Sequence, residues 1–151
     1  MKKQLLILAG VVLVAFLLMA SHRLPNDPIT SQQLEGVWEM EHQYMYENGE
    51  ITDTMFNMHG YRQVKIYSNS KVMWSRFNPN DPNEWFGYGT YTIKDGWLEE
   101  RLEYASGPMM EIVDTTQVFR FQLELDKDTF RQVALDNNGQ RYYSENYKRI
   151  E

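Results

Sequence analysis

The side chains most able to do chemistry in this chain are ionisable groups that share a strand face with large apolar residues. The pairs are Arg76 with Trp74, Glu100 with Leu102, Glu145 with Tyr147, and His42 with Trp38. Side chains alternate between the two faces of a strand, so each pair points the same way. A buried carboxylate is costly unless a cation pairs with it. Arg76 facing Glu100 or Glu145 would meet that requirement and could present a polar end to a mainly apolar ligand.

Two other interpretations of the same groups stay open. In the first they are structural ion pairs, with Glu145 against Arg149 and with Glu100 against Arg76 or solvent. In the second, two carboxylates in an aromatic cavity serve glycoside hydrolysis, but the sequence does not define their separation. We expect His42 to be a wall histidine rather than a base. The prediction is therefore a binding protein and no enzyme.

Metal and cofactor signals are missing from the sequence. The three histidines, at positions 22, 42 and 59, lack the paired spacing of a zinc site. Asp126-Lys127-Asp128 does not follow the spacing of a calcium loop. No nucleophile elbow, phosphate loop or dinucleotide fingerprint occurs in the chain. We expect no metal and no cofactor.

Composition excludes further classes of protein. The chain has 151 residues, with 15 Lys and Arg against 21 Asp and Glu, and a net charge of −6. A nucleic-acid binder needs clustered basic residues, and no basic run is present. The chain contains no cysteine, which excludes a disulfide scaffold. The length allows one domain of ordinary size.

The N-terminal segment is typical of export. Lys2 and Lys3 precede an apolar run of 16 residues, 5–20, the pattern of a signal peptide. A spanning helix prefers roughly 20 apolar residues. We predict that residues 1–20 are a signal peptide, cut after Ala20, or a retained membrane anchor. Either way the rest of the chain is exported, periplasmic or extracellular, with a net charge of −8. It would contact a membrane only through an uncleaved N-terminal segment.

The rest of the chain alternates apolar and polar residues with a period of two. We assign 21–32 to a linker with a short capped helical turn, because Thr30 and Gln33 have the spacing of a capping box. Residues 33–151 form the β domain. The alternation predicts strands at 36–46, 51–58, 61–68, 71–77, 86–93, 97–104, 116–125, 129–135 and 140–150.

Turn signals separate these runs. They are Asn48-Gly49, Asp95-Gly96 and Asn138-Gly139, and such dipeptides supply the positive φ angles of tight hairpins. Two connections are longer, 78–83 and 105–114, and Pro108 could start one helical turn in the second. A flat sheet of this size would expose its apolar face and two edges. We therefore predict an all-β, single antiparallel up-and-down barrel of eight or nine strands, which either is filled or holds one small ligand.

Both ends of the β domain carry a family resemblance. Leu34-Glu35-Gly36-Val37-Trp38 opens the first strand, and Tyr147-Lys148-Arg149 lies in the last. This resembles lipocalin and calycin barrels, in which the Trp closes one end and the Arg packs across it. The resemblance implies a barrel floor of Gly36, Trp38 and Arg149. A guanidinium over an indole face also gives a cation–π contact.

A closer resemblance covers roughly residues 33–150. The chain resembles a family of small exported lipocalin-like bacterial proteins of unknown function, which implies a fold and an export route but no catalytic residues. Tyr147 departs from that pattern, because a Trp is expected there. The motifs are Lys65-Ile66-Tyr67, Lys71-Val72-Met73-Trp74, Gly87-Tyr88-Gly89-Thr90-Tyr91, Glu100-Arg101-Leu102-Glu103-Tyr104-Ala105-Ser106 and Tyr147-Lys148-Arg149-Ile150.

The sequence therefore predicts an exported lipocalin-like protein that binds a small apolar or amphipathic ligand inside its barrel. The alternative is a structural or interaction module of the cell envelope, with a filled barrel, that acts through its outer surface or loops. The predicted ligand-binding residues are His42, Tyr44, Trp74, Arg76, Tyr91, Glu100, Tyr104, Tyr143 and Glu145.

Overall fold

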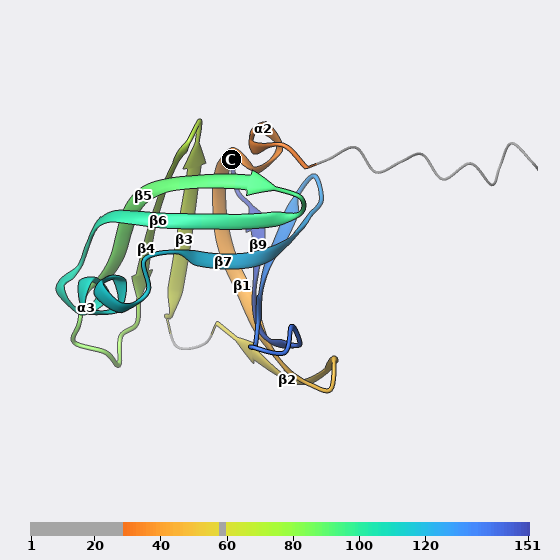
Figure 1. Ribbon diagram of the computed structural model, residues 1–151. Coiled ribbons are helices and arrows are strands. Elements are labelled where there is room, and N and C mark those ends of the chain that lie inside the picture. The colour runs from red at the N-terminus through yellow and green to blue at the C-terminus, as the bar shows by residue number, and fades with distance from the viewer. Residues whose placement is uncertain (1–28, 58–59) are drawn as a thin grey trace, which may run out of the picture.

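The computed structural model describes residues 29–57 and 60–151, which form two short helices and nine antiparallel strands (Figure 1). The predicted export segment, 1–20, and most of the predicted linker lie outside these residues. The elements are α2 (Ser31–Leu34), β1 (Gly36–Glu47), β2 (Glu50–Phe56), β3 (Arg62–Ser68), β4 (Lys71–Phe77), β5 (Trp85–Lys94), β6 (Trp97–Ala105), α3 (Gly107–Thr115), β7 (Phe119–Leu125), β8 (Thr129–Leu135) and β9 (Arg141–Arg149).

The sheet closes on itself. Strands β3 to β9 pair in chain order, β3 also pairs with β1, and β9 returns to pair with β1 antiparallel. The prediction of an all-antiparallel sheet that closes is confirmed. Closure leaves no unpaired edge within the ring and creates an inner face shared by all of its strands.

Strand β2 stands outside the ring. Residues Gly36–Glu39 of β1 pair with β3, whereas His42–Glu47 pair with β2 on the same edge. β1 continues past the end of β3, and the β1–β2 hairpin projects from the ring (Figure 1). Asn48 and Gly49 turn this hairpin with φ angles of 52° and 83°, as an Asn-Gly turn requires.

Helix α3 is longer than the single turn that Pro108 predicted. It spans nine residues, with Pro108 in its first turn, where a missing N–H costs nothing. Met109 is buried and packs with Trp74 and Ala105. The helix is held by this contact rather than by its own propensity, since a nine-residue helix is marginal alone. β7 accordingly starts at Phe119 rather than at residue 116.

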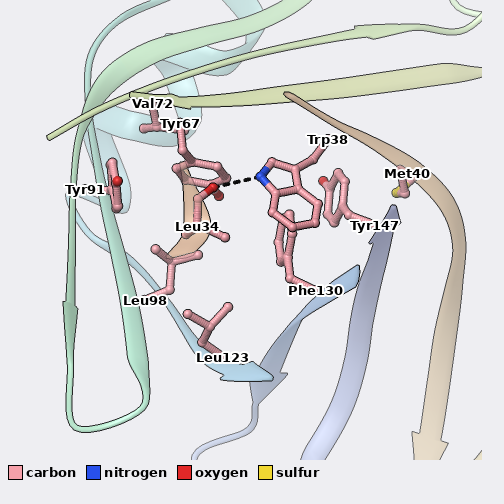
Figure 2. Close-up of a cluster of buried hydrophobic side chains, with 10 residues drawn as sticks. All are labelled: Leu34, Trp38, Met40, Tyr67, Val72, Tyr91, Leu98, Leu123, Phe130 and Tyr147. Carbon is pink, nitrogen blue, oxygen red and sulfur yellow. Dashed lines mark hydrogen bonds between the residues drawn. The ribbon is translucent and has the colours of Figure 1, made fainter. Parts of the chain in front are cut away.

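One end of the ring is filled by an apolar core (Figure 2). Trp38 lies at its centre and its indole N–H donates to the carbonyl of Leu34 in α2, at 2.8 Å. The ring of Phe130 meets Trp38 edge-on at 4.9 Å between centroids and stacks on Tyr147 at 4.5 Å. The buried members are Leu34, Trp38, Met40, Tyr67, Val72, Tyr91, Leu98, Leu123, Phe130 and Tyr147.

Gly36, Trp38 and Arg149 meet at this end. The guanidinium carbon of Arg149 lies 3.9 Å from the centroid of the Trp38 ring. Its nitrogens donate to the carbonyls of Gln33, Glu35 and Lys127. Gly36 has a φ of 137°, and a Cβ there would lie 2.4 Å from Nη1 of Arg149. Only glycine leaves room for the guanidinium, which ties α2 and the β7–β8 turn to the core.

We predict that Arg149→Ala lowers the free energy of unfolding in urea by about 2 to 3 kcal/mol, because it removes a cation–π contact and several charge-assisted hydrogen bonds. Arg120→Ala is the matched control. Arg120 also lies over a tryptophan, Trp97 at 4.2 Å, but on the exposed side of the sheet, and its loss is expected to cost less than about 1 kcal/mol. Equal losses in the two variants would contradict the role given to Arg149.

Candidate functional site

A β-bulge places His42 and Tyr44 on the outer face, against the sequence prediction. Met40 pairs with Tyr147 on β9, but His42 pairs with Asn146, so Glu41 is an extra residue on β1. An extra residue inverts the alternation that follows it. His42 and Tyr44 are therefore directed away from the interior. They line an outer hollow of about 200 Å³ with Glu124, Arg131 and Asn146, among others.

A second bulge moves Tyr104 outward. Tyr88 pairs with Tyr104, whereas Gly89 pairs with Leu102, which leaves Glu103 extra on β6. The backbones approach so closely here that a Cβ on Gly89 would lie 1.9 Å from the carbonyl oxygen of Arg101. Tyr104 is 61% exposed. Its predicted place inside the ring is wrong because the bulge follows Leu102.

The side chain of Tyr91 points into the ring, but it lies at the end that the apolar core around Trp38 fills. It is buried in the Trp38 cluster, with its ring 4.9 Å from that of Tyr67. Burial raises the pKa of its hydroxyl to about 12. The ring packs the core and does not line the cavity described next.

A cavity of about 270 Å³ lies between α3 and the middle of the ring. Its wall takes side chains from α3 and from each of strands β3 to β9. Four predicted ligand-binding residues line it together, and they are Trp74, Arg76, Glu100 and Glu145. The apolar lining residues are Trp74, Trp85, Leu102, Met109, Ile112, Phe119 and Phe121, and the polar ones are Gln63, Arg76, Glu100, Gln132 and Glu145.

The partner of Glu100 is Lys65, which is not among the predicted partners; the alternatives that gave it Arg76 or solvent are wrong. The Lys65 Nζ lies 2.9 Å from Oε1 and 3.1 Å from Oε2 of Glu100, and it also donates to Oε1 of Gln132 at 2.8 Å. Tyr67 donates its hydroxyl to Oε1 of Glu100 at 2.5 Å. Lys65 and Glu100 are each about 4% exposed. A buried ion pair persists only with such additional hydrogen bonds.

Glu145 is the second carboxylate in the cavity wall. Together with Gln63, Lys65, Glu100 and Gln132 it forms a hydrogen-bonded group that we call the polar layer. Its Oε2 accepts hydrogen bonds from Tyr147 at 2.5 Å, Gln132 at 2.8 Å and Gln63 at 3.1 Å. Tyr143 donates to its Oε1 at 3.2 Å. The Gln132 amide thus joins the two carboxylates through Lys65. The alternative in which Glu145 pairs with Arg149 is wrong, because Arg149 is at the filled end.

Arg76 lies at the rim of the cavity. Its Nη2 is 3.7 Å from Oε1 of Glu145, and its Nε donates to Oε1 of Gln63 at 2.7 Å. The guanidinium lies 5.9 Å from the Trp74 ring and 6.0 Å from the Trp85 ring. About 31% of the side chain is exposed. Of the two partners that the sequence offered Arg76, Glu100 or Glu145, the structure places it beside Glu145.

The polar layer has no orphaned groups. Within residues 29–57 and 60–151, every buried side-chain nitrogen and oxygen has a hydrogen-bond partner. Burial, reinforced by the nearby Glu100 and Glu145 charges, raises the pKa of Tyr67 and Tyr147 well above the usual 10.0, and burial with Glu145 raises the pKa of Tyr143. These phenols stay protonated and act as donors to the carboxylates.

Sequence reasoning missed Lys65, Gln63 and Gln132. On β3 the polar Gln63 and Lys65 are buried with Tyr67, while Val64 and Ile66 point outward. An aliphatic residue is normally assigned to the buried face, so the pattern misleads. Two features of the sequence could have identified Lys65. It lies two residues before Tyr67 and therefore on the same face of the strand, and a buried Glu100 needs a buried cation.

No group of three or more His, Cys, Asp and Glu side chains is placed to hold a metal ion in the described part of the chain. None of its helices combines the length and apolar character that crossing a bilayer requires.

Comparisons with known proteins give one distant likeness. No protein-family model and no curated protein matches this chain. Among solved structures it is similar to the crystal structure of an uncharacterized protein from Bacteroides eggerthii DSM 20697, with 18% sequence identity and a TM-score of 0.47. The match covers 75% of this chain and 98% of that chain. A likeness at this level supports no inference about function.

We predict that stability falls at alkaline pH through the buried phenols. Above pH 10 the unfolded chain loses the protons of Tyr67, Tyr143 and Tyr147, while the folded protein retains them. Their stabilisation is complete below about pH 10 and is lost as the pH rises further. The free energy of unfolding should be constant from about pH 8 to about pH 9, begin to fall near pH 10, and approach a slope of about 1.4 kcal/mol per pH unit for each phenol about one unit above that.

Tyr67→Phe should therefore reduce this slope by about one phenol's share, measured by urea unfolding over the same pH series. Tyr104→Phe, which alters an exposed ring on the outer face, is the matched control. An identical slope in wild type and Tyr67→Phe would contradict the assignment.

Proposed function

We propose that this protein is an exported, lipocalin-like barrel that binds a small, largely apolar ligand in the cavity beneath α3. The observation that carries the proposal is the composition of the cavity wall, in which seven apolar side chains face a layer of paired polar groups. Ligand sites are typically concave, mostly apolar and supplied with a few placed polar groups. The volume of about 270 Å³ is close to the roughly 300 Å³ at which such sites begin.

The division of the interior supports binding over simple packing. The Trp38 cluster fills one end of the ring, whereas the other end has space between the polar layer and α3. Glycine at position 87 contributes to that space, because a Cβ there would lie 2.7 Å from Nε1 of Trp74. The Trp74 ring is thereby free to form the wall.

The carboxylates favour binding over catalysis. Glu100 and Glu145 are both tied by hydrogen bonds from the protein's own side chains. A general acid or base needs to reach its substrate and to exchange a proton with it. We therefore assign these groups to the shape and polarity of a binding site. The export part of the proposal rests on the apolar run at 5–20 that follows Lys2 and Lys3.

Leu102→Trp should abolish ligand uptake by filling the cavity. Leu102 lines the cavity from β6, and overpacking there is expected to cost about 1 to 3 kcal/mol of stability. Binding of butylbenzene, an uncharged apolar probe, is measured by calorimetry. The variant should bind at least about tenfold more weakly.

Ile66→Trp, on the exposed outer face of β3, is the control and should bind as wild type does. Mass spectrometry of solvent extracts from protein purified out of its native envelope should show a small molecule that is absent from Leu102→Trp. A wild-type interior that takes up neither butylbenzene nor any native compound would overturn the proposal.

A second candidate function, an interaction module of the cell envelope, is favoured by a row of apolar side chains on the outer face. Ile66, Met73, Tyr88 and Tyr104 come from four successive strands and are direct cross-strand neighbours. Each is between 36% and 61% exposed. Contiguous exposed apolar side chains commonly mark an interaction surface.

This candidate predicts a different mutational pattern. Met73→Lys should lower co-sedimentation of the purified protein with isolated envelopes by about tenfold, because it places a charge in the middle of the row. Leu102→Trp should leave co-sedimentation unchanged and should affect only uptake of butylbenzene. If Met73→Lys sediments as wild type does, the outer row is not an interaction surface.

A further inference from the structure

We infer that the cavity selects ligands whose polar end is a protonated amine, and that Glu100 is the residue that binds this end. The inference rests on the proposed function, since it names the class of ligand for the same cavity. The free donors, free acceptors and charges of the polar layer point to this ligand. The polar layer forms the floor of the cavity, at the side away from α3.

The donors of Lys65, Gln63 and Tyr67 at the floor are consumed, which leaves one N–H of Gln132 there and the Nη groups of Arg76 at the rim. An ammonium has three N–H groups, and Lys65 directs Nζ to both oxygens of Glu100 and to Gln132. Both N–H groups of the Gln63 amide are used, by Glu145 and by Tyr147. The hydroxyl of Tyr67 donates to Glu100. A carboxylate or phosphate that reached the floor would find few donors without disrupting these contacts.

Acceptor capacity does remain there. A carboxylate offers about four lone-pair sites, and Glu100 accepts two hydrogen bonds from Lys65 and one from Tyr67. The open site is on Oε2, where only Lys65 donates, at 3.1 Å. Glu100 also lines the cavity. A group that contacts it there must therefore donate a hydrogen bond.

The buried charges favour a cation over a neutral donor. Lys65, Glu100 and Glu145 carry together one positive and two negative charges, and each of the three is less than a tenth exposed. Arg76 supplies the balancing positive charge only from the rim, at 3.7 Å and 31% exposed, where water screens it. A positive ligand group beside Glu100 would bring the buried layer to neutrality, and an anion would double its excess.

The aromatic walls suit the same charge. A cation is stabilised over an aromatic face within about 6 Å of its centroid. Lys65 Nζ lies 5.8 Å from the Phe121 ring, and Arg76 lies 5.9 and 6.0 Å from the rings of Trp74 and Trp85. The site already holds cations against its aromatic rings, and an arylalkyl or alkyl amine would add one from the cavity side.

The test compares four probes of matched size, phenylpropylamine, phenylpropanol, phenylpropionate and butylbenzene, by calorimetry at neutral pH. The amine should bind about 10- to 100-fold more tightly than the propionate, with the alcohol between them. Glu100→Gln should weaken binding of the amine by about 10- to 100-fold and bring its affinity down to that of the alcohol. Lys65→Met should strengthen binding of the amine, because the ligand nitrogen takes the place of Nζ beside Glu100.

Glu103→Gln is the matched control, since Glu103 is on the same strand but pairs with Lys71 on the exposed face. If a single variant fails to fold, the double variant Lys65→Met/Glu100→Gln, which removes both charges together, replaces it and should lose preference for the amine. Propionate binding equal to or tighter than that of the amine would overturn the inference, while butylbenzene binding would still support the proposed function. Failure of all four probes would overturn the inference, and it would overturn the proposed function as well if no native compound is extracted.

Discussion

The antiparallel pairing of β1 with β9 closes the sheet into a ring with an enclosed interior. Trp38 sits opposite Arg149 in that pairing, and Met40 sits opposite Tyr147. With this pairing in place, the seven other strand pairings, from β1–β3 round to β8–β9, leave no unpaired edge in the ring. All inward side chains therefore share one space. The Trp38 cluster with Arg149 across it fills one end of that space. What the other end can do depends on this closure, because an open sheet would expose Lys65, Glu100 and Glu145 to water.

The polar layer between the two ends of the ring places charged groups in the interior, where their desolvation costs free energy. Removing charges from water costs several kcal/mol per ion, and a pair such as Lys65 and Glu100 is often no more stable than apolar residues of the same volume. Here each charge is also hydrogen-bonded, through Gln132, Gln63 and the phenols of Tyr67, Tyr143 and Tyr147. Such a layer is better explained by what it presents to the cavity above it than by stability. The proposed amine site gives that layer a use.

The two bulges determine which side chains reach the cavity. The extra residue Glu41 turns His42 and Tyr44 outward, and the extra residue Glu103 does the same to Tyr104. The residues before each bulge keep the expected face, as Trp38 and Met40 do on β1 and Glu100 and Leu102 do on β6. Gly89 makes the second bulge possible by allowing a backbone approach that a Cβ would block. One extra residue in a strand is thus enough to move an aromatic side chain from the interior of the ring to the surface.

The sequence by itself determined the nine strands and the hairpin turns at Asn48-Gly49 and Asp95-Gly96, because alternation and turn chemistry are local properties. It predicted the closure of the sheet because a flat sheet of this size would expose an apolar face and two edges. It also placed Trp74, Arg76, Glu100 and Glu145 on the inner face, since parity within an unbroken strand is reliable. Tertiary structure decided the rest. Whether Glu100 meets Arg76 or Lys65 depends on strand order and register across the ring, and no local pattern encodes these. A bulge depends on how two strands fit together, so the outward positions of His42, Tyr44 and Tyr104 were readable only from the pairing itself.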